Sequence, residues 1–400
     1  MKYSKFCCYK PHISSLTNKE IESPYLVLDE LFTKRTMEDF QNSLWTLQRT
    51  IFKDNEWRNY DPADFYIFCY DLIRFTDTLW LVNKYSPGLS SSLNNIADES
   101  SEPGLMDNLN RLFTHHGNKD AHEENDKSRT VLSNFFDYHY NGFNRSDLYC
   151  YLQLALDASY MRNDKYEYFC MEDHKLASDF FNLSELIEEG YKIYQHGAHI
   201  LPRLPSCKET KLAIDYDRPT LLSYECIAKP HDLAGDFFLY YLDIYHIHSG
   251  LDNWKALLYE KDFWKKANNP GNLIYLYECL IKLIESIWMM CVKNDLEKYT
   301  GNYKIKTGET VSLARNCSLE EQANPLLAIQ RFFAFKKMHE WRTLLHKWLV
   351  YSLSNSEKNV PKNQYKTDLA FNQLLKLLEA SHLIFNTQKE AEDIVDQTNP

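Results

Sequence analysis

The chain has 400 residues, of which 44% are hydrophobic and 14% are aromatic, and its formal net charge is −11. The apolar share is enough for a large core, and the negative charge argues against a nucleic-acid partner. No run reaches the ~18 apolar residues of a membrane span, and the start lacks the apolar stretch of a signal peptide. Ten cysteines without a Cys-x-x-Cys pair are typical of a reducing compartment. We therefore expect a cytoplasmic protein with no membrane partner.

Apolar residues recur at the spacing of amphipathic helices, so we expect an all-α protein. One two-helix pattern occurs four times, which indicates four divergent helical hairpins packed as a solenoid-like array or bundle. In chain order the expected parts are a leader at 1–23, hairpin 1 at 24–88, a polar loop at 89–129, hairpin 2 at 130–195, a proline-containing connector at 196–230, hairpin 3 at 231–295, an extended loop or small hairpin at 296–323, hairpin 4 at 324–386 and an acidic tail at 387–400.

Within hairpin 1, a first helix is expected from Pro24 to about Phe52. Asp61 is a favourable N-cap, and proline at position 62 fits a first helical turn, so the second helix is expected to begin there. Each of the other hairpins is expected to contain two helices in the same way.

The second helix of each hairpin carries the closest match between the copies. Residues 374–379 align without gaps with residues 280–285, an offset of 94 (374 minus 280), and both align with residues 72–77 and 183–188. The last position of this pattern is acidic in every copy: Asp77, Glu188, Glu285 and Glu379. Because an acidic residue recurs at this position, we expect it to have the same role in each copy.

The first helix of each hairpin carries a pair of bulky apolar residues and then a polar or basic residue. The pairs begin at Leu31, Phe135, Phe237 and Phe332, and the later positions are Gln41, Arg145, Lys255 and Arg342. In hairpin 3 we align Trp254 with Trp341, an offset of 87 (341 minus 254), whereas the phenylalanine pair has an offset of 95 (332 minus 237). This alignment predicts about eight extra residues near Tyr245.

The recurring acids and bases are candidates for partly buried ion pairs that fix the register of the two helices in each hairpin. The expected pairs are Arg145 with Glu188, Lys255 with Glu285, and Arg342 with Glu379. Gln41 replaces the base in the first copy, so Asp77 requires another partner there. The alternative is that the acids are solvated, and the sequence leaves both interpretations open.

Histidines in the polar loop are candidates for a metal site, because His and carboxylate are common ligands of zinc. His115, His116 and His122 lie among acidic residues, but they lack the helical spacing of a His-Glu-x-x-His site. A solvated charge run is the alternative, so no metal is assigned. His246 and His248 form a second group with the same ambiguity.

Residues 111–116 have the form Arg-x-x-x-x-His. This pattern resembles the active-site motif of the HEPN family of helical ribonucleases, in which an arginine and a histidine project from a helix end, usually across a dimer. The resemblance covers six residues and implies catalytic roles for Arg111 and His116.

The sequence contains no glycine-rich phosphate loop and no nucleophile elbow, which favours binding over catalysis. We therefore expect a non-catalytic helical-repeat protein without a cofactor, acting as a protein-binding scaffold or adaptor. Candidate interface residues are Trp57, Tyr245 and Trp264. The alternatives are a HEPN-like ribonuclease and a binder of a small apolar ligand. Weak self-association through the end hairpins is compatible with this architecture.

Overall fold

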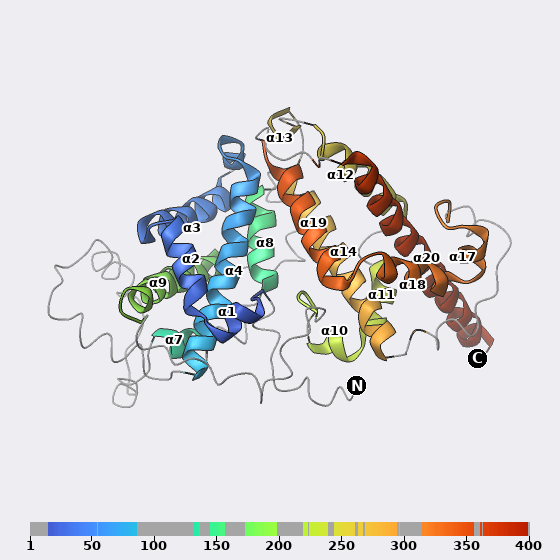
Figure 1. Ribbon diagram of the computed structural model, residues 1–400, viewed down its shortest axis with the longest axis horizontal. Coiled ribbons are helices and arrows are strands. Elements are labelled where there is room, and N and C mark those ends of the chain that lie inside the picture. The colour runs from blue at the N-terminus through green and yellow to red at the C-terminus, as the bar shows by residue number, and fades with distance from the viewer. Residues whose placement is uncertain are drawn as a thin grey trace. The chain divides into compact units, whose positions relative to one another are not determined.

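The computed structural model describes most of the residues in the expected hairpins (Figure 1). The described residues are 15–53, 55–85, 131–136, 145–156, 173–197, 219–222, 224–238, 244–260, 263–266, 269–293, 296, 314–355, 361 and 363–398. Helix is the only regular secondary structure within these ranges, which confirms the all-α prediction. None of the helices in them combines the length and the apolar character needed to cross a membrane.

The chain divides into two compact units. Unit 1 consists of residues 1–46, 71–147 and 170–213, and unit 2 consists of residues 47–70, 148–169 and 214–400. Helices α3 (Met37–Phe52), α4 (Pro62–Tyr85) and α8 (Arg145–Leu156) each contribute residues to both units.

Unit 1 is organised around phenylalanine side chains of hairpin 1. Its other helices are α1 (Asn18–Glu22), α2 (Tyr25–Lys34), α7 (Val131–Asn134) and α9 (Asp173–Gly197). Helix α9 packs against α2 and α7. The ring of Phe32 lies edge-on to Phe75 and Tyr191, with centroid distances of 6.0 and 5.1 Å. A Cβ atom at residue 190 would lie 2.3 Å from the Phe75 ring, so the close approach of α9 to α4 requires Gly190.

Unit 2 contains the helices of hairpins 3 and 4, together with short helices of hairpin 1 and of the segments at 196–230 and 296–323. They are η3 (Glu56–Asn59), α10 (Tyr224–Ala228), α11 (Pro230–Asp236), α12 (Ile244–Leu257), α13 (Phe263–Lys266), α14 (Pro270–Lys293), α17 (Leu319–Ala323), α18 (Pro325–Phe335), α19 (Met338–Leu353) and α20 (Gln364–Thr398). Helix α11 packs on α14 and α18 packs on α20. Helices α19 and α12 instead pack on α14 and α20 respectively, and both pairs are visible in Figure 1.

The first helix of a hairpin is interrupted, which corrects the prediction of one helix from Pro24 to Phe52. Helix α2 ends where Arg35 adopts an extended conformation, and α3 begins after Thr36, whose hydroxyl accepts a hydrogen bond from the Asp39 N–H (3.0 Å). Helices α18 and α19 are separated in the same way by extended backbone at Lys336. The Thr36 hydroxyl competes with continued helical hydrogen bonding at the first interruption, and the Glu340 carboxylate, which accepts from the Lys337 N–H (2.8 Å), does so at the second.

The segments outside the expected hairpins contain further helix. The leader includes α1, and α17 occupies the end of the segment predicted as an extended loop at 296–323. Both short helices begin with a capping box, formed by Thr17 with Glu20 and by Ser318 with Glu321. Helix α20 continues into the expected acidic tail. The polar loop at 89–129 lies outside the described residues, as does most of the connector at 196–230.

Candidate functional site

Glu379 on α20 binds the backbone of the segment that leads into hairpin 4. Its Oε2 accepts hydrogen bonds from the N–H groups of Asn316 (2.8 Å) and Cys317 (3.0 Å), and its Oε1 accepts one from the Asn316 side chain (2.7 Å). Glu379 is 1% exposed. Hydrogen bonds to an ionised group are roughly twice as strong as neutral ones, so this carboxylate fixes the segment firmly. We call residues 316–323 strap 4.

Two other recurring acids bind the equivalent segments of hairpins 3 and 1. Glu285 accepts hydrogen bonds from the N–H groups of Thr220 (2.6 Å) and Leu221 (2.9 Å) and from the Thr220 hydroxyl (2.7 Å). Asp77 accepts hydrogen bonds from the N–H (3.2 Å) and the hydroxyl of Ser15. We call residues 15–22 strap 1 and residues 220–222 strap 3.

The three acids share both their burial and their separation from the strap. Asp77 and Glu285 are 2% and 0% exposed, like Glu379. The acid follows its first strap donor by 62 residues in hairpin 1, 65 in hairpin 3 and 63 in hairpin 4. The recurring acid is therefore a binding group for a backbone segment in these three hairpins, and the solvated alternative does not hold for it.

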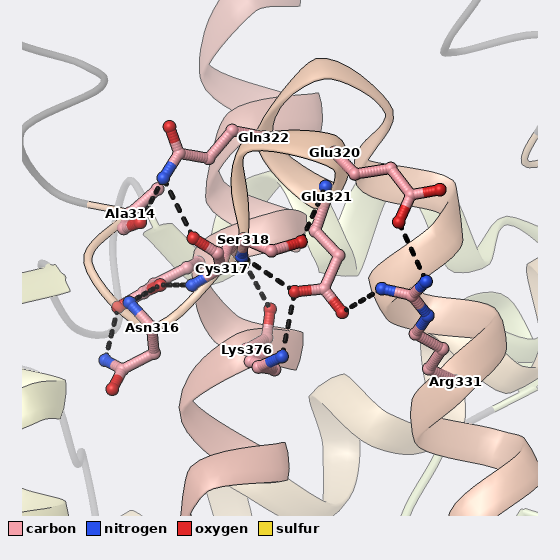
Figure 2. Close-up of polar contacts among 10 residues, drawn as sticks. Ala314, Asn316, Cys317, Ser318, Glu320, Glu321, Gln322, Arg331 and Lys376 are labelled. Carbon is pink, nitrogen blue, oxygen red and sulfur yellow. Dashed lines mark hydrogen bonds and ion pairs between the residues drawn. The ribbon is translucent and has the colours of Figure 1, made fainter.

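Straps 1 and 4 are also held by groups of three charged side chains. In unit 2, Glu321 lies between Lys376 and Arg331, and each cation donates a hydrogen bond of 2.8 Å to it (Figure 2). Burial opposes ionisation of Glu321, but the hydrogen bonds from Lys376 and Arg331 lower its pKa to about 2. Gln322 completes strap 4 by donating to the carbonyl oxygens of Ala314 and Cys317, both at 2.9 Å.

The group of three charged side chains in unit 1 occupies positions that match those of the group in unit 2. The sign of the charge differs at one of the three positions. Arg74 donates hydrogen bonds to Glu20 on strap 1 and to Glu30 on α2, the latter at 2.7 Å. Arg74 aligns with Lys376 (376 minus 74 is 302), and Glu20 aligns with Glu321 (321 minus 20 is 301). In both groups a cation of the last helix binds a glutamate of the strap. The third member is Glu30 in unit 1 and an arginine in unit 2.

The polar residue on the interrupted first helix contacts the acid of a neighbouring hairpin. Arg342 Nη1 lies 3.5 Å from Glu285 Oε1, and His248 Nε2 lies 3.5 Å from Glu379 Oε1. In unit 1, Gln41 donates a hydrogen bond of 2.9 Å to Glu188. These contacts join different hairpins because α19 packs on α14 and α12 packs on α20.

The expected ion pairs within each hairpin are therefore corrected. Arg342 lies against Glu285 instead of Glu379, and Lys255 forms its ion pair with Asp368 at 2.7 Å instead of with Glu285. Helix α8 begins at Arg145, but the side chain of this residue lies outside the described part of the chain.

The aromatic contacts of α12 and α19 correct the alignment of hairpin 3. Trp254 meets Trp348 edge-on, with ring centroids 6.5 Å apart. The offset between these residues is 94 (348 minus 254), which also relates His248 to Arg342 and Glu285 to Glu379. Trp254 thus corresponds to Trp348 instead of Trp341, and the eight extra residues predicted near Tyr245 are not required.

A cluster of tyrosine and histidine in unit 2 has no counterpart among the sequence candidates; Tyr66 is buried, and Tyr70 and His346 are half-buried. The Tyr66 hydroxyl lies 2.8 Å from His346 Nδ1, and the Tyr70 ring is centred 4.6 Å from the His346 ring. Burial, followed by the nearby charge of Lys347, lowers the pKa of His346 to about 4. Burial also raises the pKa of Tyr66. The imidazole is therefore neutral at neutral pH and serves as a hydrogen-bonding group within the core.

The three aromatic residues considered as interface anchors differ in exposure. Trp57 and Trp264 are 2% and 4% exposed, and Trp264 Nε1 donates a hydrogen bond of 2.6 Å to the Ser352 carbonyl. Both are core residues of unit 2, which corrects their assignment. Tyr245 is 64% exposed and stays a candidate.

The remaining candidates fall largely outside the described residues. This applies to Arg111, His115, His116 and His122, so the structure tests neither the ribonuclease motif nor the loop metal site. His246 is exposed, and His248 contacts Glu379. Among the residues that the structure does describe, no group of three His, Cys, Asp or Glu side chains could hold a metal ion.

Comparison of the chain with protein-family models, with curated proteins and with solved structures finds no match.

Proposed function

We propose that this protein is a helical-repeat scaffold or adaptor that binds a protein partner. The observation that carries this proposal is the recurrence of a backbone-binding carboxylate in three hairpins. Asp77, Glu285 and Glu379 each use their charge to hold a strap, so the ionisable residues that repeat along the chain serve the architecture. Repeat architectures of this kind commonly present binding surfaces.

The contacts in unit 2 support a paired arrangement of hairpins 3 and 4. Arg342 of hairpin 4 contacts the acid of hairpin 3, and His248 of hairpin 3 contacts the acid of hairpin 4. Trp254 and Trp348, which are equivalent residues, contact each other. Reciprocal contacts between equivalent positions are the signature of approximate two-fold symmetry. We infer that the hairpins associate in pairs within the proposed repeat.

Exposed apolar side chains in unit 2 are the proposed contacts for a partner. Tyr245 on α12 is 64% exposed, Tyr365 on α20 is 76% exposed, and Leu319 on α17 is 83% exposed. Tyrosine combines a large rigid apolar ring with a hydrogen-bonding group and is enriched at protein interfaces. We therefore propose Tyr245 and Tyr365 as anchors of the interface.

The proposal places the protein in the cytoplasm. Free thiols persist in a reducing compartment, and burial raises the pKa of the Cys69 and Cys279 thiols, which keeps them protonated and unreactive. Cys69, Cys279, Cys291 and Cys317 in the described part of the chain have free thiols. The ribonuclease and small-ligand alternatives stay predictions from the sequence.

Site-specific photocrosslinking in the native cytoplasm tests this proposal. A photoreactive amino acid replaces Tyr245 or Tyr365, and a matched control carries it at Asp252, another exposed position on α12. We expect one discrete protein to be crosslinked from the tyrosine positions and not from the control. RNA cleavage by the wild type that is lost in the Arg111→Ala, His116→Ala double variant would contradict the proposal and establish the ribonuclease.

A further inference from the structure

Two sites in unit 2 occupy equivalent positions in hairpins 3 and 4 and make reciprocal contacts. Glu285 of hairpin 3 lies 3.5 Å from Arg342 of hairpin 4, measured from Oε1 to Nη1. Glu379 of hairpin 4 lies 3.5 Å from His248 of hairpin 3, measured from Oε1 to Nε2. The offset is 94 both for the acids (379 minus 285) and for their partners (342 minus 248). The partner of Glu285 is permanently charged, whereas the partner of Glu379 is charged only when its imidazole is protonated.

The aromatic residue beside each acid differs in the same way. Three residues after the acid, hairpin 3 carries Trp288 and hairpin 4 carries His382. Trp288 packs on Phe333 of hairpin 4, and His382 lies edge-on to Phe238 of hairpin 3, with ring centroids 5.3 Å apart in each case. The contacts are therefore exchanged between the hairpins here as well. The arginine and the tryptophan at the first site do not titrate near neutral pH, whereas the second site has histidine at both positions.

The His248 ring faces the Glu379 carboxylate without a hydrogen bond to it. Nε2 of His248 is buried and has no hydrogen-bond partner among the described residues. In the imidazolium both ring nitrogens are donors, so protonation places an N–H group on the nitrogen that is nearest to Glu379. Because that carboxylate is fully buried, water screens its attraction to a cation only weakly. The His248 side chain is 25% exposed, so the ring can exchange a proton with solvent.

The groups that face His248 favour the uptake of one proton by the site and disfavour a second. Helix α20 presents Glu379 and His382 to this ring. His382 is 7% exposed, and burial, followed by the charge of His248, lowers its pKa. Helix α14, which also packs on α12, presents Tyr277, and burial keeps the hydroxyl of this residue neutral by raising its pKa. On α12 itself, Asp252 lies one turn from His248 and is exposed.

We propose that His248 and Glu379 form a pH-sensitive contact between hairpins 3 and 4, which strengthens when His248 takes up a proton. The imidazolium then holds α12 against α20, in the way that Arg342 holds α19 against α14. As the pH rises the proton leaves, the attraction is lost, and α12 separates from α20 more often. The contact of Arg342 with Glu285 keeps its strength throughout. This inference does not depend on the scaffold function.

Amide hydrogen exchange in the full chain at about pH 6 and about pH 8, on either side of the usual titration of histidine, tests this contact. Mass spectrometry follows peptides from α12 and α19, and protection factors remove the direct effect of pH on the exchange rate. We expect the protection of α12 to be about threefold higher at the lower pH, because an ion pair with a partly exposed member contributes a modest free energy. The protection of α19 should be equal at both pH values. His346 on α19 stays neutral in this range, because its pKa is about 4.

Variants of the protein assign the effect to His248. His248→Gln and His248→Arg should each remove the pH dependence of α12, because glutamine carries no charge and arginine carries a permanent one. Arg342→His should give α19 the pH dependence that it lacks in the wild type. Two controls, His382→Gln and His246→Gln, should leave the dependence of α12 in place, and the second changes an exposed histidine on the same helix. Circular dichroism establishes that each variant is folded.

Equal protection of α12 at the two pH values in the wild type would overturn the proposal. An equal change in α12 and α19 would also overturn it, because the response would then belong to the whole unit and not to one contact. A dependence that persists in His248→Gln, or that disappears in His382→Gln, would show that a group other than His248 is responsible. The wild-type measurement decides between the first two outcomes without any variant, so the proposal stays testable even if one variant does not fold.

Discussion

At the scale of single residues, the most informative side chains are buried carboxylates, and histidines that are partly buried. Glu379 has three hydrogen-bond donors from strap 4 and lies 3.5 Å from His248. A buried carboxylate is tolerated when it accepts several hydrogen bonds in this way. His346, which is half-buried beside Tyr66, is instead kept neutral by desolvation, which lowers its pKa.

The stability of unit 2 should depend on pH through His346. The pKa of this residue falls from 6.5 in the unfolded chain to about 4 in the folded one, so the unfolded state binds the extra proton between these values. Its contribution is complete above pH 6.5 and is lost as the pH falls toward 4. A shift of this size corresponds to about 3 kcal/mol of unfolding free energy.

Urea unfolding of wild type and His346→Gln between pH 4 and pH 7 measures this contribution. We expect the wild type to lose more free energy of unfolding than the variant across this range, because glutamine does not titrate. Parallel pH profiles for the two proteins would show that His346 is protonated equally in the folded and unfolded states.

The recurrence of the acids could be predicted from the sequence, but their partners could not. The acids occur in gap-free matching segments, so their equivalence is visible without a structure. Their partners are backbone N–H groups of Ser15, Thr220 and Asn316, which differ in side chain and precede the acids by 62 to 65 residues. A backbone donor leaves no trace in residue type, whereas basic side chains are visible in the sequence and were therefore expected to pair with the acids.

At the scale of elements, the short strap helices and the interrupted first helices form one recurring design. Helices α1 and α17 each begin with a capping box and are followed by α2 or α18. The sequence predicts the helices, because their apolar periodicity is strong. It does not predict the interruptions at Arg35 and Lys336, because hydrophobic periodicity continues across them.

Exchange of the charges of Lys376 on α20 and Glu321 on strap 4 tests whether their ionic contact holds the strap. Lys376→Glu places three carboxylates together, since Glu321 and Glu379 are both buried nearby. We expect a loss of about 3 kcal/mol in the free energy of unfolding. The double variant Lys376→Glu, Glu321→Lys should recover part of this loss, because the pair is restored with the opposite orientation.

Lys366→Glu is the matched control for this experiment, because Lys366 is an exposed cation on the same helix. Its effect should stay within about 0.5 kcal/mol. If the double variant is no more stable than Lys376→Glu alone, the ionic contact does not determine how strap 4 is held.

At the scale of the whole molecule, we propose a repeat whose hairpins exchange contacts in pairs. The pairing depends on packing, since α19 lies on α14 and α12 lies on α20. Apolar patterning indicates which face of a helix is buried but not which neighbour covers it, so this exchange could not be predicted from the sequence. The expected pairing of Arg342 with Glu379 was wrong for this reason.

A double-mutant cycle tests the exchanged contact between hairpins 3 and 4. Combining Arg342→Met with Glu285→Gln should give a coupling free energy of about 1 kcal/mol, because the two side chains are in contact. Combining Arg342→Met with Glu379→Gln should give additive effects within about 0.5 kcal/mol. Coupling to Glu379 in place of Glu285 would restore pairing within one hairpin.

Amide hydrogen exchange in three single variants, Asp77→Asn, Glu285→Gln and Glu379→Gln, tests whether the recurring acids hold the straps. We expect each variant to accelerate exchange at its own strap, namely at Ser15, at Thr220 and Leu221, or at Asn316 and Cys317, while the other two straps keep their protection. Unchanged exchange at the matching strap, or equal loss of protection at all three straps, would contradict the claim that the recurring acids bind the straps.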